Sequence, residues 1–156
     1  MSLRIDIDLG YEFTVKAGVK AVFDLLSDVP ASASHFPMVD RLVDLGDGVY
    51  RWEMQKLGTP QVHIQAVYAS RYASNRRKGL VEWTPVPGVG NAQISGRWVV
   101  AKAQAGTTCE LHVQGTVELP LPALMQLVVE PVVQVEFERL VEQYIDNLIQ
   151  RFGGEV

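Results

Sequence analysis

The sequence predicts an α+β fold in which a curved antiparallel sheet of about seven strands packs around one long C-terminal helix. Three observations predict it. Residues 5–15 alternate between apolar and polar side chains, as a half-buried strand does. Residues 39–119 contain further strand-like segments joined by short turns, which favours antiparallel neighbours. Residues 132–152 repeat apolar side chains at three- and four-residue steps, the spacing of an amphipathic helix.

The segment after the first strand changes period. Apolar residues from Val19 to Leu26 form a helical stripe that stops near Asp28, before Pro30. Residues 31–36 have small side chains and weak periodicity, and Pro37 follows them. We therefore expect one short helix after the first strand, and then either a second helical turn or a loop.

Six further strands are predicted between the short helices and the terminal helix. They cover residues 39–45, 49–57, 61–72, 80–84, 92–103 and 107–119. Gly46-Asp47-Gly48 is a tight hairpin signal between the first two. Gly88-Val89-Gly90 lacks the other glycines of a phosphate loop and leads into a strand, so we interpret it as a hairpin connection.

The terminal helix begins after Pro120-Leu121-Pro122 and is expected over residues 132–152. Its charged and polar residues occupy the opposite side from its apolar face. That face consists of Val133, Phe137, Leu140, Val141, Tyr144, Leu148 and Phe152. Burying seven such side chains contributes on the order of 10 to 20 kcal/mol before ordering entropy is subtracted. We therefore expect the helix to lie on the sheet, with room for a ligand cavity between the two layers.

Composition predicts a single soluble domain over residues 1–156. The chain is 47% hydrophobic, and no apolar run approaches the roughly 18 residues of a membrane span. A net charge of −4 disfavours a nucleic-acid partner. Cys109 is the single cysteine, which excludes an internal disulfide, and Asp6 and Asp8 stand where a signal peptide would be basic or apolar. We expect a cytoplasmic protein.

The chain resembles the START-like, helix-grip superfamily, whose members include polyketide cyclase/dehydrase, coenzyme Q-binding and lipid-transport proteins. The resemblance covers almost the whole chain and lies in the order of elements, the first-helix sequence at residues 22–28, the aromatic-Pro-x-Val step at residues 36–39 and the late strand that carries Trp98. It implies a helix-grip fold with a hydrophobic pocket for a lipid, quinone or polyketide-like molecule, and it implies no cofactor.

Large aromatic residues on the apolar sides of the strands and helix are the candidate pocket wall, because their rings offer contact area and their polar edges can orient a ligand. Ordinary core packing is the alternative for each of them. The predicted ligand-binding residues are Tyr11, Phe13, Phe36, Trp52, Tyr68, Trp98, Phe137, Val141 and Tyr144. Loops around Phe36 and Pro87 are expected to gate entry.

Histidines predict no metal site. His63 and His112 alternate with apolar neighbours and should face outward, and no His-Glu-x-x-His spacing is present. His35 precedes Phe36 in a segment that the resemblance places near the cavity entrance, where it either contacts a ligand or is simply solvated.

Other polar residues give two further candidates. Arg51, Glu53, Gln61, Ser95 and Arg97 are candidate polar pocket residues, and Glu53 and Arg97 either pair across the sheet or decorate its outer face. The run Arg76-Arg77-Lys78 at a hairpin tip is either a transient membrane-surface contact or a solvated turn.

These observations predict a protein that binds or carries an apolar small molecule between the sheet and the terminal helix. An enzyme of the polyketide cyclase/dehydrase type that uses the same cavity is one alternative. An interaction domain whose core is filled by its own side chains is another. We find no serine-histidine-acid, paired-carboxylate or cysteine-histidine arrangement that would commit the chain to catalysis.

Overall fold

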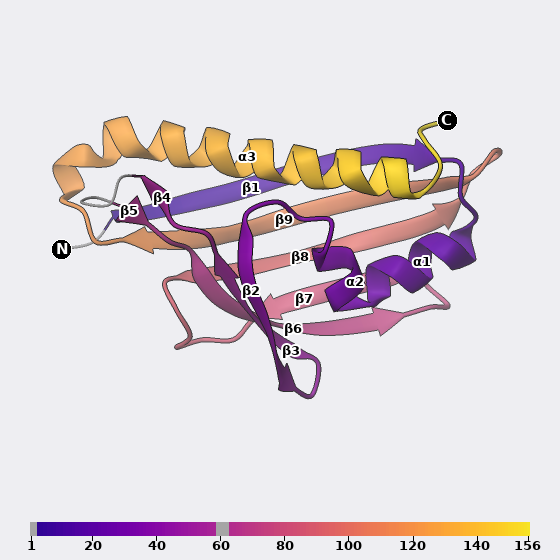
Figure 1. Ribbon diagram of the computed structural model, residues 1–156, viewed down its shortest axis with the longest axis horizontal. Helices are drawn as coiled ribbons and strands as arrows, with labels where there is room; N and C mark the ends of the chain where they lie inside the picture. The colour runs from indigo at the N-terminus through magenta and orange to yellow at the C-terminus, as the bar shows by residue number, and fades with distance from the viewer. Residues whose placement is uncertain (1–2, 59–62) are drawn as a thin grey trace.

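The computed structural model describes residues 3–58 and 63–156 and has the predicted α+β architecture (Figure 1). A long strand β1 (Leu3–Val15) is followed by two short helices, α1 (Val19–Ser27) and α2 (Val29–Ala33). The other strands are β2 (Val39–Gly46), β3 (Val49–Met54), β4 (Leu57–Gly58), β5 (His63–Ile64), β6 (Val67–Asn75), β7 (Leu80–Pro85), β8 (Ala92–Lys102) and β9 (Thr107–Leu119). A short 3₁₀ turn η1 (Ala123–Met125) leads into the long helix α3 (Gln126–Arg151).

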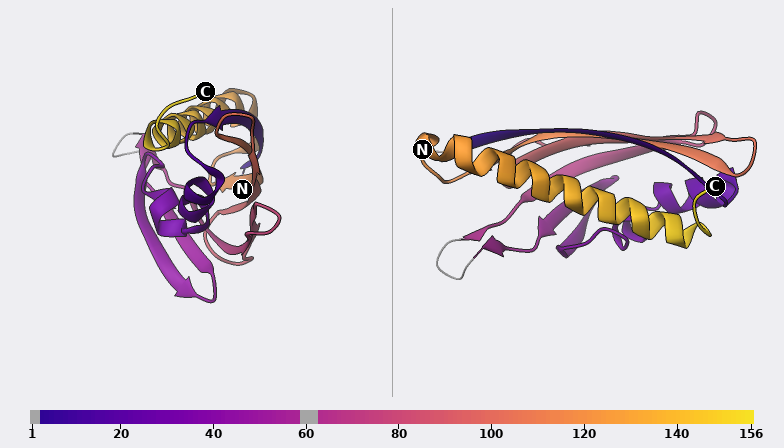
Figure 2. Two further views of the ribbon diagram at one scale, coloured as in Figure 1. Left: turned by 90° about the vertical axis from the view of Figure 1, so that its right-hand side faces the viewer. Right: turned by 90° about the horizontal axis from the view of Figure 1, so that it is seen from above.

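Seven strands form one antiparallel sheet in the order β1-β9-β8-β7-β6-β3-β2. The first and last long strands are paired along their whole length, from Leu3 opposite Leu119 to Val15 opposite Thr107. The sheet curves strongly, and Figure 2 shows α3 lying along its open side with α1 and α2 at one end. This curvature is what creates an interior between the sheet and α3.

The two ends of α3 are held differently. At its C-terminal end, backbone bonds from Lys16 N to Gly154 O (3.0 Å) and from Ala17 N to Phe152 O (3.1 Å) tie the helix to the end of β1. In its first half the helix is held by side chains: Gln126 Nε2 donates to the Arg4 carbonyl (3.3 Å) and Gln134 Nε2 to the Asp6 carbonyl (3.0 Å). Leu140, Val141, Tyr144, Ile145 and Leu148 are buried, so the deeply packed part of α3 is its second half.

The helix begins at Gln126, earlier than the expected residue 132. Pro131 does not mark its start but lies inside it. Proline lacks the N–H that would bond to the Leu127 carbonyl, and it is tolerated here because this side of the helix is exposed and water can reach that carbonyl.

The first short helix ends at Ser27, before Pro30, as expected. Asp28 caps α2 through a bond from Ala31 N to its Oδ1 atom (3.3 Å), and Pro30 stands in the first turn, where no N–H is needed. Of the two alternatives for the following segment, the structure has the helical one, and this helix, Val29–Ala33, begins two residues earlier than expected.

The expected strands 49–57 and 61–72 are each interrupted. The sheet strands end at Met54 and resume at Val67, with β4 and β5 forming a separate hairpin. The backbone leaves the sheet here because Gln55 N bonds to Met38 O (2.7 Å) and the Gln65 side chain bonds to Met54 O (2.8 Å). Gln61, which we considered as a pocket residue, lies outside the described residues.

Candidate functional site

Two connected cavities lie between the sheet and α3. The larger has a volume of about 620 Å³ and lies under the first half of α3, and the smaller has about 60 Å³ and lies under the second half. Tyr68, Ile94 and Phe137 line both and mark the junction. We call the first the aliphatic chamber and the second the aromatic cavity.

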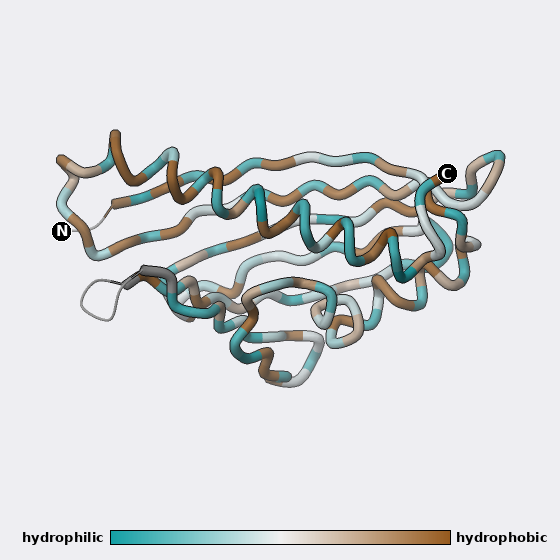
Figure 3. Tube along the Cα trace, turned by 45° about the horizontal axis from the view of Figure 1, so that its top comes forward, coloured by the Kyte–Doolittle hydropathy of each residue, from teal (hydrophilic) through white to brown (hydrophobic). Residues whose placement is uncertain are grey.

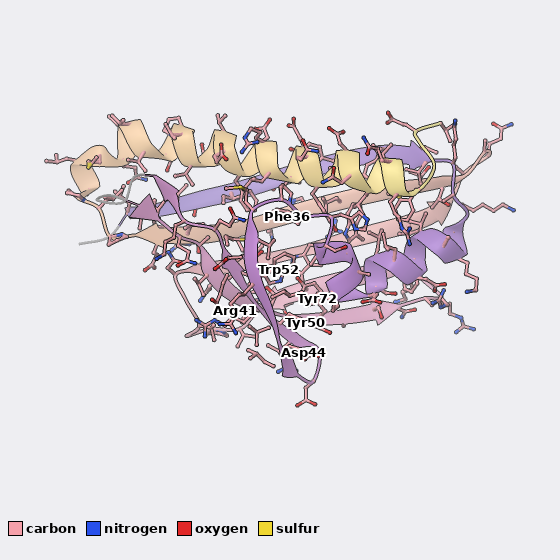
Figure 4. The ribbon with its side chains drawn as sticks, in the orientation of Figure 1. Phe36, Arg41, Asp44, Tyr50, Trp52 and Tyr72 are labelled. Carbon is pink, nitrogen blue, oxygen red and sulfur yellow. The ribbon has the colours of Figure 1, made fainter. Side chains whose placement is uncertain are left out.

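The aromatic cavity is nearly filled by its own side chains. Phe36 contacts Trp52 edge to face and Tyr144 at a tilt, with ring centroids 5.9 and 5.1 Å apart. Phe36, Trp52 and Tyr72 form a column that descends from beneath α3 (Figure 4). The absence of a side chain at Gly96 makes room for Trp83, since a Cβ atom there would lie 2.5 Å from Trp83 Cζ2. The remaining 60 Å³ has space for little more than water.

Two pairs of polar groups in the aromatic cavity satisfy each other. The Ser32 and Tyr144 hydroxyls lie 2.5 Å apart, and Trp52 Nε1 donates to the Tyr72 hydroxyl at 3.0 Å. Burial raises the pKa of Tyr144 to about 12 and the pKa of Tyr72 well above its usual range. These phenols therefore stay protonated at neutral pH and serve as internal hydrogen-bonding groups.

The aliphatic chamber is large, and its wall is almost entirely apolar. A volume of about 620 Å³ falls within the range of small-molecule sites. The sheet and the β4–β5 region supply Ile7, Met54, Ile64, Ala66, Tyr68, Ala92, Ile94, Val117 and Leu119, and α3 with its preceding turn supplies Leu121, Met125, Val128, Val129, Val132, Val133, Phe137 and Leu140. Met38, Gln55, Gln65 and Glu136 complete it. Such a wall gains free energy from removing apolar ligand surface from water.

The chamber opens to solvent beside the first turns of α3. Val128 and Val132 line it and are nevertheless 69% and 65% exposed. Leu124 and Leu127, which are over 90% exposed, extend this apolar surface around the outside of the helix. Figure 3 shows hydrophobic residues concentrated in these first turns, whereas the later turns are mostly polar on the outside.

Seven of the nine predicted ligand-binding residues line the aromatic cavity. They are Phe36, Trp52, Tyr68, Trp98, Phe137, Val141 and Tyr144. Only Tyr68 and Phe137 of this set also reach the aliphatic chamber. The prediction therefore brings together a real cluster, but most of its members surround the space with the least room.

Tyr11 and Phe13 lie away from both cavities. They belong to β1, the edge strand beside α3, whose residue Ile7 lines the aliphatic chamber while Tyr11 and Phe13 line neither cavity. The Tyr11 hydroxyl donates to Glu142 Oε2 at 3.3 Å. Phe13 is buried edge to face against Trp98, with centroids 5.9 Å apart.

The aliphatic wall was not among the predicted site residues. Its members are methionines, valines and leucines that also occur in any core, so their types carry no signal for a cavity. One signal was present: residues 124–132 are apolar except for Gln126 and Glu130, whereas residues 136–150 carry many more polar side chains. An apolar surface of this kind is what the mouth of an apolar chamber requires.

The polar candidates do not converge on either cavity. Arg51 Nε pairs with Glu53 Oε2 at 3.1 Å, and Arg97 is paired in register with Glu82 and His112. Of the two alternatives for Glu53 and Arg97, the pair across the sheet is therefore wrong, because β3 and β8 are not neighbours. Ser95 Oγ donates to the Gln114 carbonyl at 3.4 Å, on a partly exposed part of β8.

The histidines are also accounted for. His112 lies on the outer face with its Nε2 atom 2.8 Å from Asp8 Oδ1. His35 Nδ1 lies 2.9 Å from the Ala31 carbonyl, and Asn147 donates to the His35 carbonyl, so this residue fixes α2 to α3. The side chain of His63 lies outside the described residues. Within residues 3–58 and 63–156, no three metal-ligating side chains form a cluster.

The basic run lies at the tip of the β6–β7 hairpin, as expected, but far from the chamber mouth. Arg76 pairs with Asp24 of α1, and its guanidinium stacks 4.7 Å from the centre of the Phe23 ring. This hairpin lies at the α1 end of the molecule, whereas the chamber opens at the N-terminal end of α3 (Figure 1).

The two loops expected to gate entry differ. Phe36 borders the aromatic cavity and also an outer groove beside α2 and β2, and Met38, which lines the chamber, adopts a positive φ of 64°. Such a backbone conformation is uncommon for a residue other than glycine. Pro87 lines neither of the two inner cavities. The Phe36–Met38 segment therefore adjoins both cavities, and the Pro87 loop does not.

Comparisons with solved structures support this fold at low sequence identity. A Thermus thermophilus protein has a TM-score of 0.72 and 16% identity, with 94% of this chain and 96% of that chain covered. A START superfamily protein from Mycobacterium smegmatis has a TM-score of 0.68 and 13% identity, covering 94% and 97%. The Zhui aromatase/cyclase from a Streptomyces species has a TM-score of 0.62 and 17% identity, covering 93% and 90%.

A search of curated proteins found no match. None of the helices in the described residues is long and apolar enough to cross a membrane. The family model for polyketide cyclase / dehydrase and lipid transport proteins matches residues 7–153, which is nearly the whole chain. Together with the helix-grip architecture, this match shows that the chain belongs to the polyketide cyclase/dehydrase and lipid transport family.

Proposed function

We propose that the protein binds and carries an apolar small molecule in the aliphatic chamber. The observation that carries this proposal is the open volume of the aliphatic chamber, about 620 Å³ between the sheet and the helix. The neighbouring aromatic cavity is nearly filled by side chains. A lipid, quinone or polyketide-like molecule would fit such a space, in agreement with the family.

The binding free energy would come chiefly from apolar burial. Each CH₂ group that moves from water into the chamber contributes about 0.8 kcal/mol. Gln55 and Gln65 offer polar contacts at one side, while the charged Glu136 is already paired with Arg139, whose Nη2 atom lies 2.5 Å from Glu136 Oε1. A neutral, mostly apolar ligand suits this wall better than an anion does.

The ligand would enter beside the first turns of α3. Val128 and Val132 belong both to the chamber wall and to the outer surface, so a ligand could pass between them and the β4–β5 hairpin without crossing the packed second half of the helix. The Phe36–Met38 segment borders the inner side of the same space and is the part of the expected gate that this route retains.

Native mass spectrometry of protein purified from its source organism tests the proposal. We expect an added mass that is lost on denaturation and that organic extraction recovers as an apolar compound. A Val133→Trp variant, which fills the chamber, should lack this mass while remaining folded. A protein that is empty from its source and takes up none of a panel of lipids, quinones and polyketide-like compounds would contradict the proposal.

An enzyme of the cyclase or dehydrase type in the same chamber is the second candidate. The family supports it, as do two structural neighbours described as aromatase/cyclase proteins, and Tyr68 and Glu136 are ionisable groups in the wall. However, the Arg139 guanidinium holds the pKa of Glu136 below its usual range, so this carboxylate is a poor proton donor at neutral pH. Incubation with a poly-β-ketone thioester would decide: ring-closed products would establish the enzyme, and recovery of bound, unchanged substrate would favour the carrier.

A further inference from the structure

Tyr68 occupies the junction between the two cavities. It lies on β6, lines both the aliphatic chamber and the aromatic cavity, and is 8% exposed. Its ring is stacked on Trp52, with centroids 5.9 Å apart and planes inclined by 11°. Trp52 is its cross-strand neighbour on β3, so this stacking restricts the orientation of the Tyr68 ring.

The Tyr68 hydroxyl differs from those of the other buried tyrosines. Tyr72 accepts from Trp52 and Tyr144 is paired with Ser32, whereas Tyr68 has no hydrogen-bond partner among residues 3–58 and 63–156. A buried hydroxyl without a partner is unfavourable, so proteins rarely leave one without a reason.

Tyr68 borders internal space at this point of the fold. It is 8% exposed and lines both cavities, so its side chain lies where the two cavities meet.

Resting on the proposed function, we infer that Tyr68 donates a hydrogen bond to a neutral acceptor oxygen, such as a ketone carbonyl, at the inner end of the bound molecule. The ligand class is then an apolar molecule with a carbonyl at its leading end, and its apolar remainder extends toward Val128 and Val132 at the mouth. Burial raises the pKa of Tyr68 far above its usual range, which keeps the phenol a donor.

A neutral oxygen fits this position better than a carboxylate. Among the described residues that line the two cavities there is no lysine, arginine or histidine, and the charged member Glu136 is an anion. A buried carboxylate would thus lack a counter-ion, which is strongly unfavourable, whereas a carbonyl needs one donor.

A matched pair of probes tests the inference. 2-Acetylnaphthalene and 2-ethylnaphthalene have nearly the same shape and differ in the carbonyl oxygen, and their affinities can be measured by titration calorimetry. We expect Tyr68→Phe to weaken binding of the ketone by about 3- to 10-fold and to change binding of the hydrocarbon by less than 2-fold, because it removes one hydrogen bond and little apolar surface. Tyr50→Phe, which removes a hydroxyl from the outer groove, should change neither.

An infrared measurement on the unmodified protein covers the case in which Tyr68→Phe fails to fold. The carbonyl stretch of ¹³C-labelled 2-acetylnaphthalene should shift to lower frequency on binding, relative to the probe in hexane. A shift that persists in Tyr68→Phe, or the absence of a shift in the unmodified protein, would overturn the inference.

The two levels of the proposal fail differently. If both probes bind, and Tyr68→Phe changes the affinity for the ketone no more than the affinity for the hydrocarbon, the inference is wrong and the carrier function stands. If neither probe binds at all, the chamber does not accept apolar molecules of this size, and the inference falls together with the proposed function.

Discussion

The two halves of α3 cover two different kinds of interior. Under the second half, aromatic rings and paired hydroxyls leave about 60 Å³ free, while under the first half aliphatic side chains surround about 620 Å³. The helix is also held differently at its two ends. The residues that follow its C-terminal end bond through their backbone to Lys16 and Ala17, whereas its first half bonds to β1 through the side chains of Gln126 and Gln134 and remains exposed on its apolar side.

Val141 and Val133 show this difference at matched positions. Both are valines on the sheet-facing side of α3, two helical turns apart, but Val141 is fully buried at the aromatic cavity and Val133 is half-buried at the chamber. One helix thus packs into the core with one half and forms the wall of an open chamber with the other. The predictions below are designed to separate these two roles.

The largest expected effect is the truncation of Trp98. Trp98→Ala removes a ring that is 2% exposed and contacts Phe13 and Tyr144, so we expect a loss of about 3–5 kcal/mol in the free energy of unfolding. Val128→Ala at the chamber mouth should change it by less than about 0.5 kcal/mol. Urea denaturation followed by fluorescence measures both, and equal losses would mean that the two ends are packed alike.

The second prediction compares the two valines directly. Val141→Trp overpacks the nearly filled end and should reduce the free energy of unfolding by about 1–3 kcal/mol. Val133→Trp places the same ring in open space and should leave stability nearly unchanged while reducing affinity for 2-ethylnaphthalene at least about tenfold. The reverse pattern would show that the ligand occupies the aromatic end.

The third prediction concerns alkaline pH. Burial raises the pKa of Tyr144 to about 12, above its value near 10 in the unfolded chain, so the unfolded state loses this proton first. The stabilisation from the buried phenol is complete below pH 10 and is lost as the pH rises from 10 towards 12. Denaturation midpoints should fall over this window, and a Tyr144→Phe variant should show a shallower fall. An identical fall in both proteins would contradict this account.

The smallest effect is expected at the basic hairpin. Arg76 forms an exposed pair with Asp24, so Arg76→Ala should change the free energy of unfolding by less than about 0.5 kcal/mol. Because the hairpin lies away from the chamber mouth, transfer of a bound probe to anionic vesicles should keep the same rate. A several-fold slower transfer would show that this hairpin contacts the membrane surface during exchange.

Much of this fold could be predicted because its elements carry strong periodic patterns. The alternation in residues 5–15 correctly predicted a strand with one buried face, and the face from Val133 to Phe152 was correctly assigned to the sheet side of the helix. The helix start and α2 could not be placed as well. At Pro131 and Pro30 the proline rule for ending helices competes with the tolerance of proline at exposed or first-turn positions, and the sequence pattern does not show which condition holds.

The cavity could be predicted to exist but not to lie where it does. Apolar periodicity shows which side chains point inward. The same periodicity arises whether those side chains pack against others or border a cavity. Trp98 and Val133 therefore looked alike as inward residues, although one fills the core and the other borders the chamber. The role proposed for Tyr68 depends on a contrast, because the hydroxyls of Tyr72 and Tyr144 have hydrogen-bond partners within the protein. The sequence pattern does not show which hydroxyls are paired.

The most direct test of the central claim is a crystal structure with 2-acetyl-6-bromonaphthalene bound, in which anomalous scattering locates the bromine. The account predicts a bromine peak in the aliphatic chamber near Val128 and Val132, with the carbonyl oxygen about 2.8 Å from the Tyr68 hydroxyl. A bromine peak in the aromatic cavity or the outer groove beside α2, with the aliphatic chamber empty, would contradict it.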